Sequence, residues 1–190
     1  MGRRPARSKF IPDAYVFPGG AVDPEDKRVG VATALDPALV GSLCVADHAR
    51  RAHGLAVAAV RETFEETGLL LAAPGDVGAI DGPAWRTLRA RSLAPDLGRL
   101  GYFARAITPT SSPRRFHARF FIADANATTG TVTENGELLD LRWVTLDEAA
   151  RLPTVDVTQF MLRELRRHLA GETSPRRALW TYHAGKERIR

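Results

Sequence analysis

The segment at residues 58–69 reads AAVRETFEETGL, and it constrains the fold of this chain more than any other stretch. Residues three and four positions apart lie on one face of a helix, so Glu62, Glu65 and Glu66 share a face. Three like charges on one stripe repel one another unless a cation lies among them. Arg61 can pair with Glu65, but one guanidinium cannot neutralise three carboxylates. The segment therefore predicts a helix whose acidic stripe faces a cleft and holds a divalent cation.

The opposite face of this helix is apolar, which lets the helix bury one side and hold its carboxylates on a rigid support. Gly68 suits the left-handed position that ends a helix. Mg²⁺ prefers oxygen ligands in octahedral geometry, so we expect Mg²⁺ here, with Mn²⁺ as a substitute. A solvated acidic helix face is the alternative interpretation. The candidate core positions on the apolar side are Ala56, Val57, Ala59, Val60 and Phe64.

A glycine turn, Phe17-Pro-Gly-Gly20, precedes the acidic helix. A Gly-Gly pair permits positive φ and a close approach of the backbone to a ligand. An ordinary turn is the alternative. Because the acidic helix follows, we expect Gly19 to offer a backbone carbonyl to the metal and Gly20 to contact the substrate.

Together these segments resemble the Nudix box, Gly-x5-Glu-x7-Arg-Glu-U-x-Glu-Glu-x-Gly-U, where U is a bulky aliphatic residue. Thr63 stands at one aliphatic position. The likeness extends from Ser8 to about Leu169 and is greatest to the branch with a split box that includes the peroxisomal coenzyme A and acyl-CoA diphosphatase. The run PRRFHARFF from Pro113 also resembles that branch, although His117 and Ala118 replace its Asp and Thr.

The two halves of the box are separated by an insertion. Arg61 follows Gly20 by 41 positions, whereas the box pattern allows 14. We place the insertion at residues 24–54 and expect it at the cleft mouth, in contact with substrate. Counted back from Arg61, the box glutamate falls at His53, so it is missing in register. Asp23 and Glu25, which follow the glycine turn closely, are candidates to replace this glutamate.

The resemblance implies a three-layer α/β/α sandwich around a mixed sheet. The hydrophobic strand that usually precedes the arginine-rich N-terminal segment is missing from this sequence. Either the chain begins downstream of that strand or the protein does without it. A sheet without this strand has an exposed edge that a partner chain could cover, so a homodimer is an option. We expect a Nudix domain at residues 1–171 and a basic tail at 172–190.

The resemblance also implies roles for individual residues. A carboxylate before a Trp-bearing strand often completes a Nudix metal site or acts as base, which favours Glu137, with Glu134 as the alternate. Guanidinium groups bind phosphate through paired hydrogen bonds, so Arg115 and Arg119 are candidate phosphate ligands, or else form structural ion pairs. The expected metal ligands are Glu62, Glu65, Glu66 and Gly19; the catalytic residues Glu62, Glu65, Glu137 and Arg61; and the substrate-binding residues Gly20, Arg115 and Arg119.

Hydrophobic periodicity and capping signals predict the remaining elements. A capping box at Thr145 and Glu148 begins a short helix, and Gly171 ends the last one, whose buried stripe would be Leu162, Leu165 and Leu169. Helices are expected at 37–43, 45–52, 83–93, 145–151 and 156–170, strands at 14–17, 69–71, 103–108, 116–123, 138–144 and 178–183, and a turn at 109–113.

Composition limits the remaining possibilities. The 190 residues, 44% of them hydrophobic, suffice for one domain, and the single cysteine, Cys44, excludes a disulfide framework. A net charge of +5, concentrated at the two ends, favours anionic partners. No apolar run reaches about 18 residues and no signal region follows Met1, so we expect a cytoplasmic protein without membrane association. The Ala- and Arg-rich composition is typical of a GC-rich bacterial source.

The sequence therefore predicts Mg²⁺-dependent hydrolysis of a diphosphate linkage in a nucleotide-type small molecule. The resemblance favours CoA or acyl-CoA as the nucleoside-diphosphate-linked substrate. Alternatives are an NADH or ADP-ribose pyrophosphatase and a non-catalytic Nudix module that binds a nucleotide to regulate another process. A nucleic-acid binder is disfavoured because aromatic residues do not alternate with the terminal arginines, as base stacking requires.

Overall fold

The computed structural model describes residues 1–8, 11–43, 48–108, 115–172, 178–183 and 186–187. Cys44, the turn expected at 109–113 and parts of the insertion and tail lie outside the described residues. The chain forms two compact units. The first comprises Met1–Phe17, Phe103–Phe120 and Arg142–Arg190, and the second comprises Pro18–Tyr102 and Phe121–Leu141.

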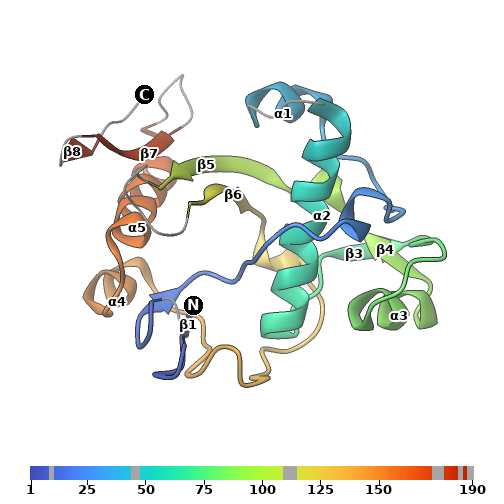
Figure 1. The fold of residues 1–190 in the computed structure, drawn as a ribbon, viewed down its shortest axis with the longest axis horizontal. Helices are drawn as coiled ribbons and strands as arrows, with labels where there is room; N and C mark the ends of the chain where they lie inside the picture. Colours follow the sequence, from blue (N-terminus) through green and yellow to red (C-terminus); the bar gives the residue numbers. More distant parts are fainter. Residues whose placement is uncertain (9–10, 44–47, 109–114, 173–177, 184–185, 188–190) are drawn as a thin grey trace. The chain divides into compact units, whose positions relative to one another are not determined.

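Helix α2 (His48–Thr67) is the longest element of the second unit (Figure 1). It begins inside the predicted insertion and continues without a break through the acidic segment. The separate helix expected at 45–52 is therefore wrong, because His48–Gly54 supplies the first turns of α2. Gly68 has φ +75° and follows the last helical residue, which confirms the predicted helix end.

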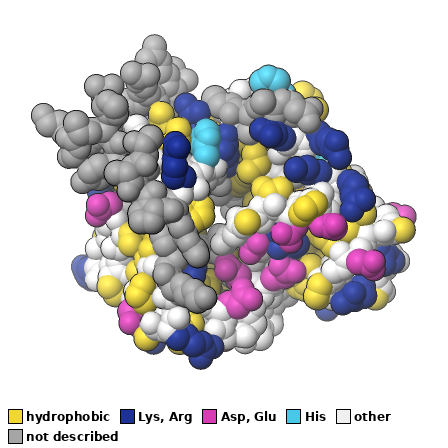
Figure 2. Space-filling view, in the orientation of Figure 1, with side chains coloured by type: hydrophobic (Ala, Val, Ile, Leu, Met, Phe, Trp, Pro, Cys, Tyr) yellow, Lys and Arg dark blue, Asp and Glu magenta, His cyan; other side chains and the backbone are white. Residues whose placement is uncertain are grey.

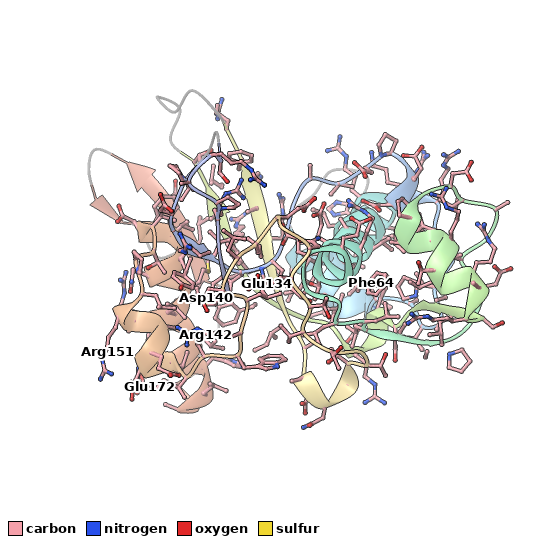
Figure 3. The ribbon with its side chains drawn as sticks, turned by 90° about the horizontal axis from the view of Figure 1, so that it is seen from below. Phe64, Glu134, Asp140, Arg142, Arg151 and Glu172 are labelled. Carbon is pink, nitrogen blue, oxygen red and sulfur yellow. The ribbon has the colours of Figure 1, made fainter. Side chains whose placement is uncertain are left out.

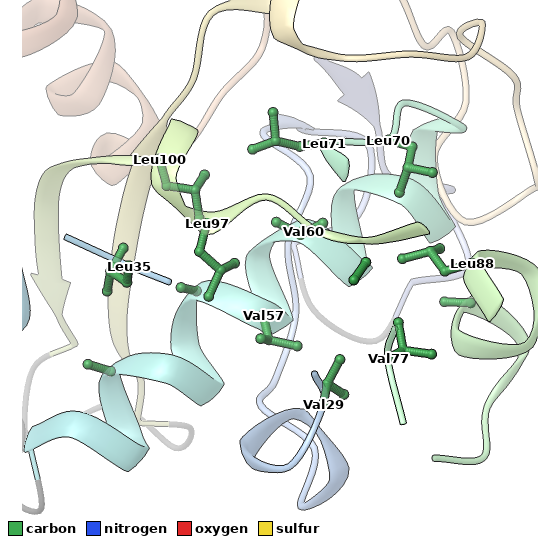
Figure 4. Packing of buried hydrophobic residues seen from close by; sticks show 14 of the residues in the cluster. Val29, Leu35, Val57, Val60, Leu70, Leu71, Val77, Leu88, Leu97 and Leu100 are labelled. Atoms are coloured by element: carbon green, nitrogen blue, oxygen red, sulfur yellow. The ribbon is translucent and has the colours of Figure 1, made fainter. Parts of the chain in front are cut away.

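The apolar face of α2 packs into the core of the second unit. Val57 and Val60 are at most 2% exposed, and Ala56 is fully buried, as their spacing predicted. Figure 4 shows aliphatic side chains from loops and short elements around them, among them Val29 and Leu97. Phe64 packs against the same cluster from a partly buried position. This packing fixes which face of α2 is left for its carboxylates.

Short elements surround α2. They are η1 (Glu25–Lys27), α1 (Pro37–Ser42), β3 (Ala72–Pro74), α3 (Pro83–Ala90), β4 (Leu93–Pro95) and η2 (Leu97–Arg99). Asp36 caps α1 by accepting a hydrogen bond from Ala38 N at 2.8 Å, which explains the predicted helix there. η3 (Ala125–Ala127) lies in the loop that follows β6.

Two expectations near β3 and β4 are wrong by a few residues. The strand expected at 69–71 lies at Ala72–Pro74, where it pairs antiparallel with Leu93–Pro95, while Leu70 makes only a single bridge to Thr129. The helix expected to reach residue 93 ends at Ala90, because Ser92 has φ +53° and the chain then enters β4.

The first unit contains the mixed sheet that the α/β class predicts. Its strand order is β6-β5-β7-β8, with β5 (Gly101–Ile107) parallel to β7 (Ala178–His183) and β7 antiparallel to β8 (Lys186–Glu187). β6 (His117–Ile122) borders β5. The predicted strand at 178–183 is confirmed, and it lies inside the sheet rather than apart from it.

Helix α5 (Asp156–Leu169) packs Phe160 and Met161 into a cluster with Ala104, Ala106 and Trp180. Gly171, with φ +77°, follows its end as predicted. The predicted buried stripe is only partly right. Leu162 is buried, but Leu169 is 67% exposed, because the apolar stripe is centred on the N-terminal half of the helix. Helix α4 (Leu146–Arg151) precedes it and carries both hydrogen bonds of the predicted capping box.

The strand expected at 138–144 is wrong. The structure describes all seven residues, and none belongs to a strand longer than a single bridge. Asp140 has φ +47°, which interrupts an extended run, and Trp143 is 64% exposed. The backbone of Arg142 instead exchanges hydrogen bonds with Met1 at 2.9 and 3.1 Å.

The N-terminal segment contributes a two-residue strand, β1 (Gly2–Arg3), which pairs antiparallel with β2 (Tyr15–Val16). Arg3 thus belongs to β1, and Arg4 and Arg7 follow it before β2. No helix in the described part of the chain combines the length and the apolar character that crossing a bilayer requires.

Candidate active site

Arg61 lies at the centre of the acidic stripe of α2. Its Nη1 donates to Glu62 Oε1 and to Glu65 Oε2, both at 2.9 Å, so the predicted pairing with Glu65 is present. Its Nη2 also donates to the Ala21 carbonyl at 2.9 Å. The Arg61 side chain is only 8% exposed. A buried guanidinium thus serves as the cation among these acids.

Asp26 is the residue that sequence reasoning missed. Arg61 donates from Nε and Nη2 to the two carboxylate oxygens of Asp26, each at 3.0 Å, and Asp26 is fully buried. Two parallel N–H···O bonds form the strongest geometry between arginine and carboxylate. Asp26 lies six positions after Gly20, which is the spacing that the box pattern gives its first acid. Counting forward from Gly20, instead of backward from Arg61, would have found it.

The expected register at His53 is therefore wrong. The residues that lengthen the box relative to the Nudix pattern follow Asp26 in the chain. Because η1 packs on α2, Asp26 lies next to Arg61. His53 Nε2 instead contacts the Val29 carbonyl at 2.9 Å. Of the two residues considered as replacements, Asp23 is 3.5 Å from Arg61 and 58% exposed, and Glu25 pairs with Arg28.

Burial and charge act in opposite directions on this cluster. Burial by itself lowers the pKa of Arg61, but hydrogen bonding to Asp26 and the Asp26 charge raise that pKa above its ordinary value, and Glu65 and Glu62 add to the effect. Burial raises the pKa of Glu62, which Arg61 opposes only in part. A further cation near Glu62 would therefore favour the ionised form of this carboxyl.

The glycine turn lies against the acids, as its sequence position predicted. The Gly19 N–H donates to Glu66 Oε2 at 2.8 Å, and Glu66 is only 7% exposed. A Cβ placed on Gly20 would overlap the carboxylate of Glu62. Any larger residue at position 20 would therefore require the Glu62 carboxylate to move from its position beside Arg61. The structure thus brings Gly19 and Gly20 together with two of the three predicted metal ligands.

A loop following β6 caps the C-terminal end of α2. Thr133 N donates to the Thr67 carbonyl at 2.9 Å, and Asn135 Nδ2 donates to the Glu65 carbonyl at 2.5 Å. Figure 3 shows this loop, with Glu134 labelled, passing beside the end of α2. The backbone of Glu137 is bound to the same amide, since its N–H donates to Asn135 Oδ1 at 2.9 Å. Nothing in the sequence pattern singled out Asn135.

The two arginines predicted to bind phosphate lie in the first unit. Arg119 Nη1 donates to the His117 carbonyl at 2.7 Å, and Arg115 is exposed. Burial, followed by the charges of Arg119 and Arg105, lowers the pKa of His117. The phosphate-binding role of Arg115 and Arg119 stays a prediction.

The insertion at residues 24–54 is partly structural. Leu35 and Leu43 are buried in the core of the second unit, and Lys27 lies against Gly54, where a Cβ would overlap its side chain. The insertion also supplies Asp26, which holds Arg61. Contact between the insertion and a substrate stays a prediction.

The oxygen donors fit a hard divalent cation in their chemistry, because carboxylates are the ligands that Mg²⁺ prefers. Acidic side chains gather on one face over the lower half of α2 (Figure 2). Among the described residues, no three His, Cys, Asp or Glu side chains converge as a metal-binding group. Arg61 pairs with two of these acids, with its Nη1 2.9 Å from both Glu62 Oε1 and Glu65 Oε2.

Comparisons with known proteins agree with this geometry. Residues 41–165 match the family model described as "NUDIX domain". A curated relative from Xenopus laevis, "Acyl-coenzyme A diphosphatase NUDT19", is 26% identical over 77% of this chain and 52% of its own. "Putative nudix hydrolase 7" from Caenorhabditis elegans is 26% identical over 76% of this chain and 45% of its own. The chain thus spans about half the length of these curated relatives.

A solved structure, "Crystal structure of NUDIX hydrolase from Alicyclobacillus acidocaldarius", superposes with a TM-score of 0.64 at 30% identity. The alignment covers 90% of this chain and 86% of that one. This neighbour confirms the expected α/β fold. The matched family model includes all of α2 and its acidic stripe, whereas the turn at Gly19 and Asp26 lie before the matched range. The family match, the solved neighbour and the site geometry lead to one conclusion: this chain belongs to the Nudix family.

Proposed function

We propose that this protein is a Mg²⁺-dependent hydrolase that cleaves a diphosphate linkage in a nucleoside-diphosphate-linked small molecule. The observation that carries the proposal is the arrangement around Arg61. One buried guanidinium binds Asp26, Glu62 and Glu65, while the glycine turn lies against Glu62 and Glu66. Such an arrangement is costly for a purely structural helix face, because it buries several charges.

In this proposal Glu62, Glu65, Glu66 and the Gly19 carbonyl would hold the cation. Bound there, Mg²⁺ would offset the charge of the phosphoryl oxygens and lower the pKa of a water molecule. Arg61 orients Glu62 and Glu65 through its two hydrogen bonds and is itself held by Asp26. The hydrogen bonds of Arg61, and those of Asp26 to Arg61, would hold the proposed metal ligands Glu62 and Glu65 in position before substrate binds.

Glu137 is the proposed general base or additional ligand, and the contacts of Glu134 favour this choice. Glu134 Oε1 accepts a hydrogen bond from Leu141 N at 3.1 Å, so this carboxylate already stabilises the loop that carries it. Glu137 is exposed, and its backbone is bound next to the end of α2. A general base must reach the attacking water directly or through one other water. An exposed carboxylate on a loop that is bound to the end of α2 has the contact with solvent that this role requires.

CoA and acyl-CoA are the first substrates to test. Their choice rests on the named activity of the Xenopus relative, acyl-CoA diphosphatase, which is 26% identical over 77% of this chain. A screen for Mg²⁺-dependent hydrolysis should therefore contain CoA, acyl-CoA, NADH, ADP-ribose and diadenosine polyphosphates, with products identified by mass. Saturable nucleotide binding without any Mg²⁺-dependent product would overturn the proposal in favour of a non-catalytic module.

Replacing Glu65 tests the metal role directly. Glu65→Gln removes one ionised ligand and is expected to lower Mg²⁺-dependent kcat/KM at least about 100-fold, because charge stabilisation at a reacting phosphoryl group is a large term. The side chain is 32% exposed, so the unfolding midpoint should change little. Glu164→Gln, which alters another Arg-Glu pair on α5, is the matched control and should retain full turnover. Full activity of Glu65→Gln would remove Glu65 from the ligand set.

A further inference from the structure

The end of α2 has a backbone carbonyl that the helix itself does not satisfy. The last four carbonyls of a helix have no partner within it. Glu65 O would normally bind the N–H of Leu69, but Leu69 N donates to Thr67 Oγ1 at 3.1 Å. Asn135 Nδ2 donates to Glu65 O instead, at 2.5 Å. A side chain from a loop 70 positions away thus completes the helix at one of its acidic residues.

The other end of the same amide binds Glu137. Asn135 Oδ1 accepts a hydrogen bond from Glu137 N at 2.9 Å, and Gly136 between them has φ +90°, which closes the tight turn. Leu138 follows in the core at 1% exposure and anchors the chain just after Glu137. A single amide group therefore connects the backbone of Glu65 to the backbone of Glu137.

The two partners require an amide at this position. A carbonyl needs a donor and an N–H needs an acceptor, and among short side chains only asparagine carries the donor and the acceptor on two separate atoms, whereas a serine or threonine hydroxyl must serve both partners from one oxygen. Aspartate supplies the acceptor but sets a carboxylate oxygen against the Glu65 carbonyl. Alanine supplies neither. The residue type is thus explained by these two contacts, although Asn135 is itself exposed.

We propose that Asn135 is a positioning residue that holds Glu137 in reach of the carboxylates of α2. This inference rests on the proposed function, in which Glu137 acts on the water or the metal. In this proposal Asn135 acts on turnover through Glu137, because both ends of its amide are hydrogen-bonded to backbone atoms of the protein. Small displacements of a reacting group are costly, since about 1 Å can lower a rate about 100-fold.

A double-mutant cycle with Glu137 tests the proposal. Asn135→Ala is expected to lower kcat at least about tenfold with KM changed less than about twofold, because a positioning residue whose amide is bound to the backbone affects the reacting geometry rather than the binding of substrate. On a Glu137→Gln background, the same change should have no further effect on kcat. Independent losses that multiply in the double variant would overturn the proposal. Asn126→Ala, an exposed asparagine in η3, is the matched control and should leave kcat unchanged.

A second measurement does not depend on turnover. In the wild-type protein the amide of Glu137 should be protected from hydrogen exchange, and Asn135→Ala should remove that protection. An unprotected Glu137 amide in the wild type overturns the inference even if the enzyme is active. If no substrate is hydrolysed, the proposed function fails, and the exchange result then shows whether the amide bridge exists. Should Asn135→Ala not fold, the isosteric Asn135→Asp removes only the donor and enters the same cycle.

Discussion

At the scale of single residues, the site depends on how Arg61 is held. Its guanidinium is bound by the fully buried Asp26 through two hydrogen bonds and by the partly exposed Glu62 and Glu65. Asp26 keeps Arg61 in one orientation, and Nη1 of Arg61 in turn bridges the two glutamates. The acids that we propose to bind the metal are therefore positioned by a carboxylate that is itself fully buried.

Asp26→Asn should destabilise the protein by about 3 kcal/mol, because it removes the one fully buried partner of Arg61 and leaves the buried guanidinium with only the partly exposed Glu62 and Glu65. Urea unfolding measures this free energy. Asp23→Asn is the control, since Asp23 is 58% exposed and 3.5 Å from the same guanidinium, and it should cost less than about 1 kcal/mol. Equal, small effects of both changes would contradict the role given to Asp26.

At the scale of secondary-structure elements, termini are closed by side chains in both units. Asn135 binds the end of α2, and Thr145 with Glu148 caps the start of α4. The cap makes two contacts at Glu148, whose carboxylate accepts from the Thr145 N–H at 2.8 Å and from the Thr145 hydroxyl at 2.8 Å. Hydrogen bonding from the Thr145 backbone, then from its side chain, lowers the pKa of Glu148.

The lowered pKa makes the start of α4 sensitive to acid. Because the carboxyl titrates lower in the folded than in the unfolded chain, its contribution to stability is complete above the ordinary value of 4.5 and is lost as pH falls through the lowered value. Carbon-detected NMR should show Glu148 titrating below 4.5. Glu148→Gln should remove this part of the acid dependence of unfolding, whereas a Glu148 titration at or above 4.5 would contradict the cap.

At the scale of the whole molecule, each compact unit has its own apolar cluster. The cluster of the second unit surrounds α2, and that of the first joins α5 to β5 and β7. The basic tail predicted at 172–190 contains β7, whose Leu179 and Trp180 are 6% and 7% exposed. Truncation therefore tests whether the predicted domain can end at residue 171.

Truncation after Gly171 should lower Tm by about 10 °C or more. Loss of a buried tryptophan alone costs about 3–5 kcal/mol, and each kcal/mol shifts Tm by about 2–4 °C in a chain of this size. Truncation after His183 keeps β7 and should change Tm far less. Thermal unfolding followed by circular dichroism compares the two, and similar melting of both truncated chains would show that β7 contributes little.

The sequence by itself determined the features that depend on nearest neighbours along the chain. The 3.6-residue period specified which face of α2 is buried, the four-residue spacing of Glu65 from Arg61 predicted their pairing, and the Thr145 cap began α4. The glycine turn was also correctly associated with the acids, because the family resemblance joined two segments that the insertion separates.

Only the tertiary structure decided the contacts between segments far apart in sequence. It returned Asp26 to Arg61 across the insertion, bound Asn135 to Glu65, paired Arg142 with Met1 instead of forming the expected strand, and placed β7 parallel to β5. The physical reason is the same in each case. Such contacts form where buried polar groups are hydrogen-bonded and apolar faces are packed against other apolar residues. The local periodicity of a sequence does not specify which distant segment will supply these partners.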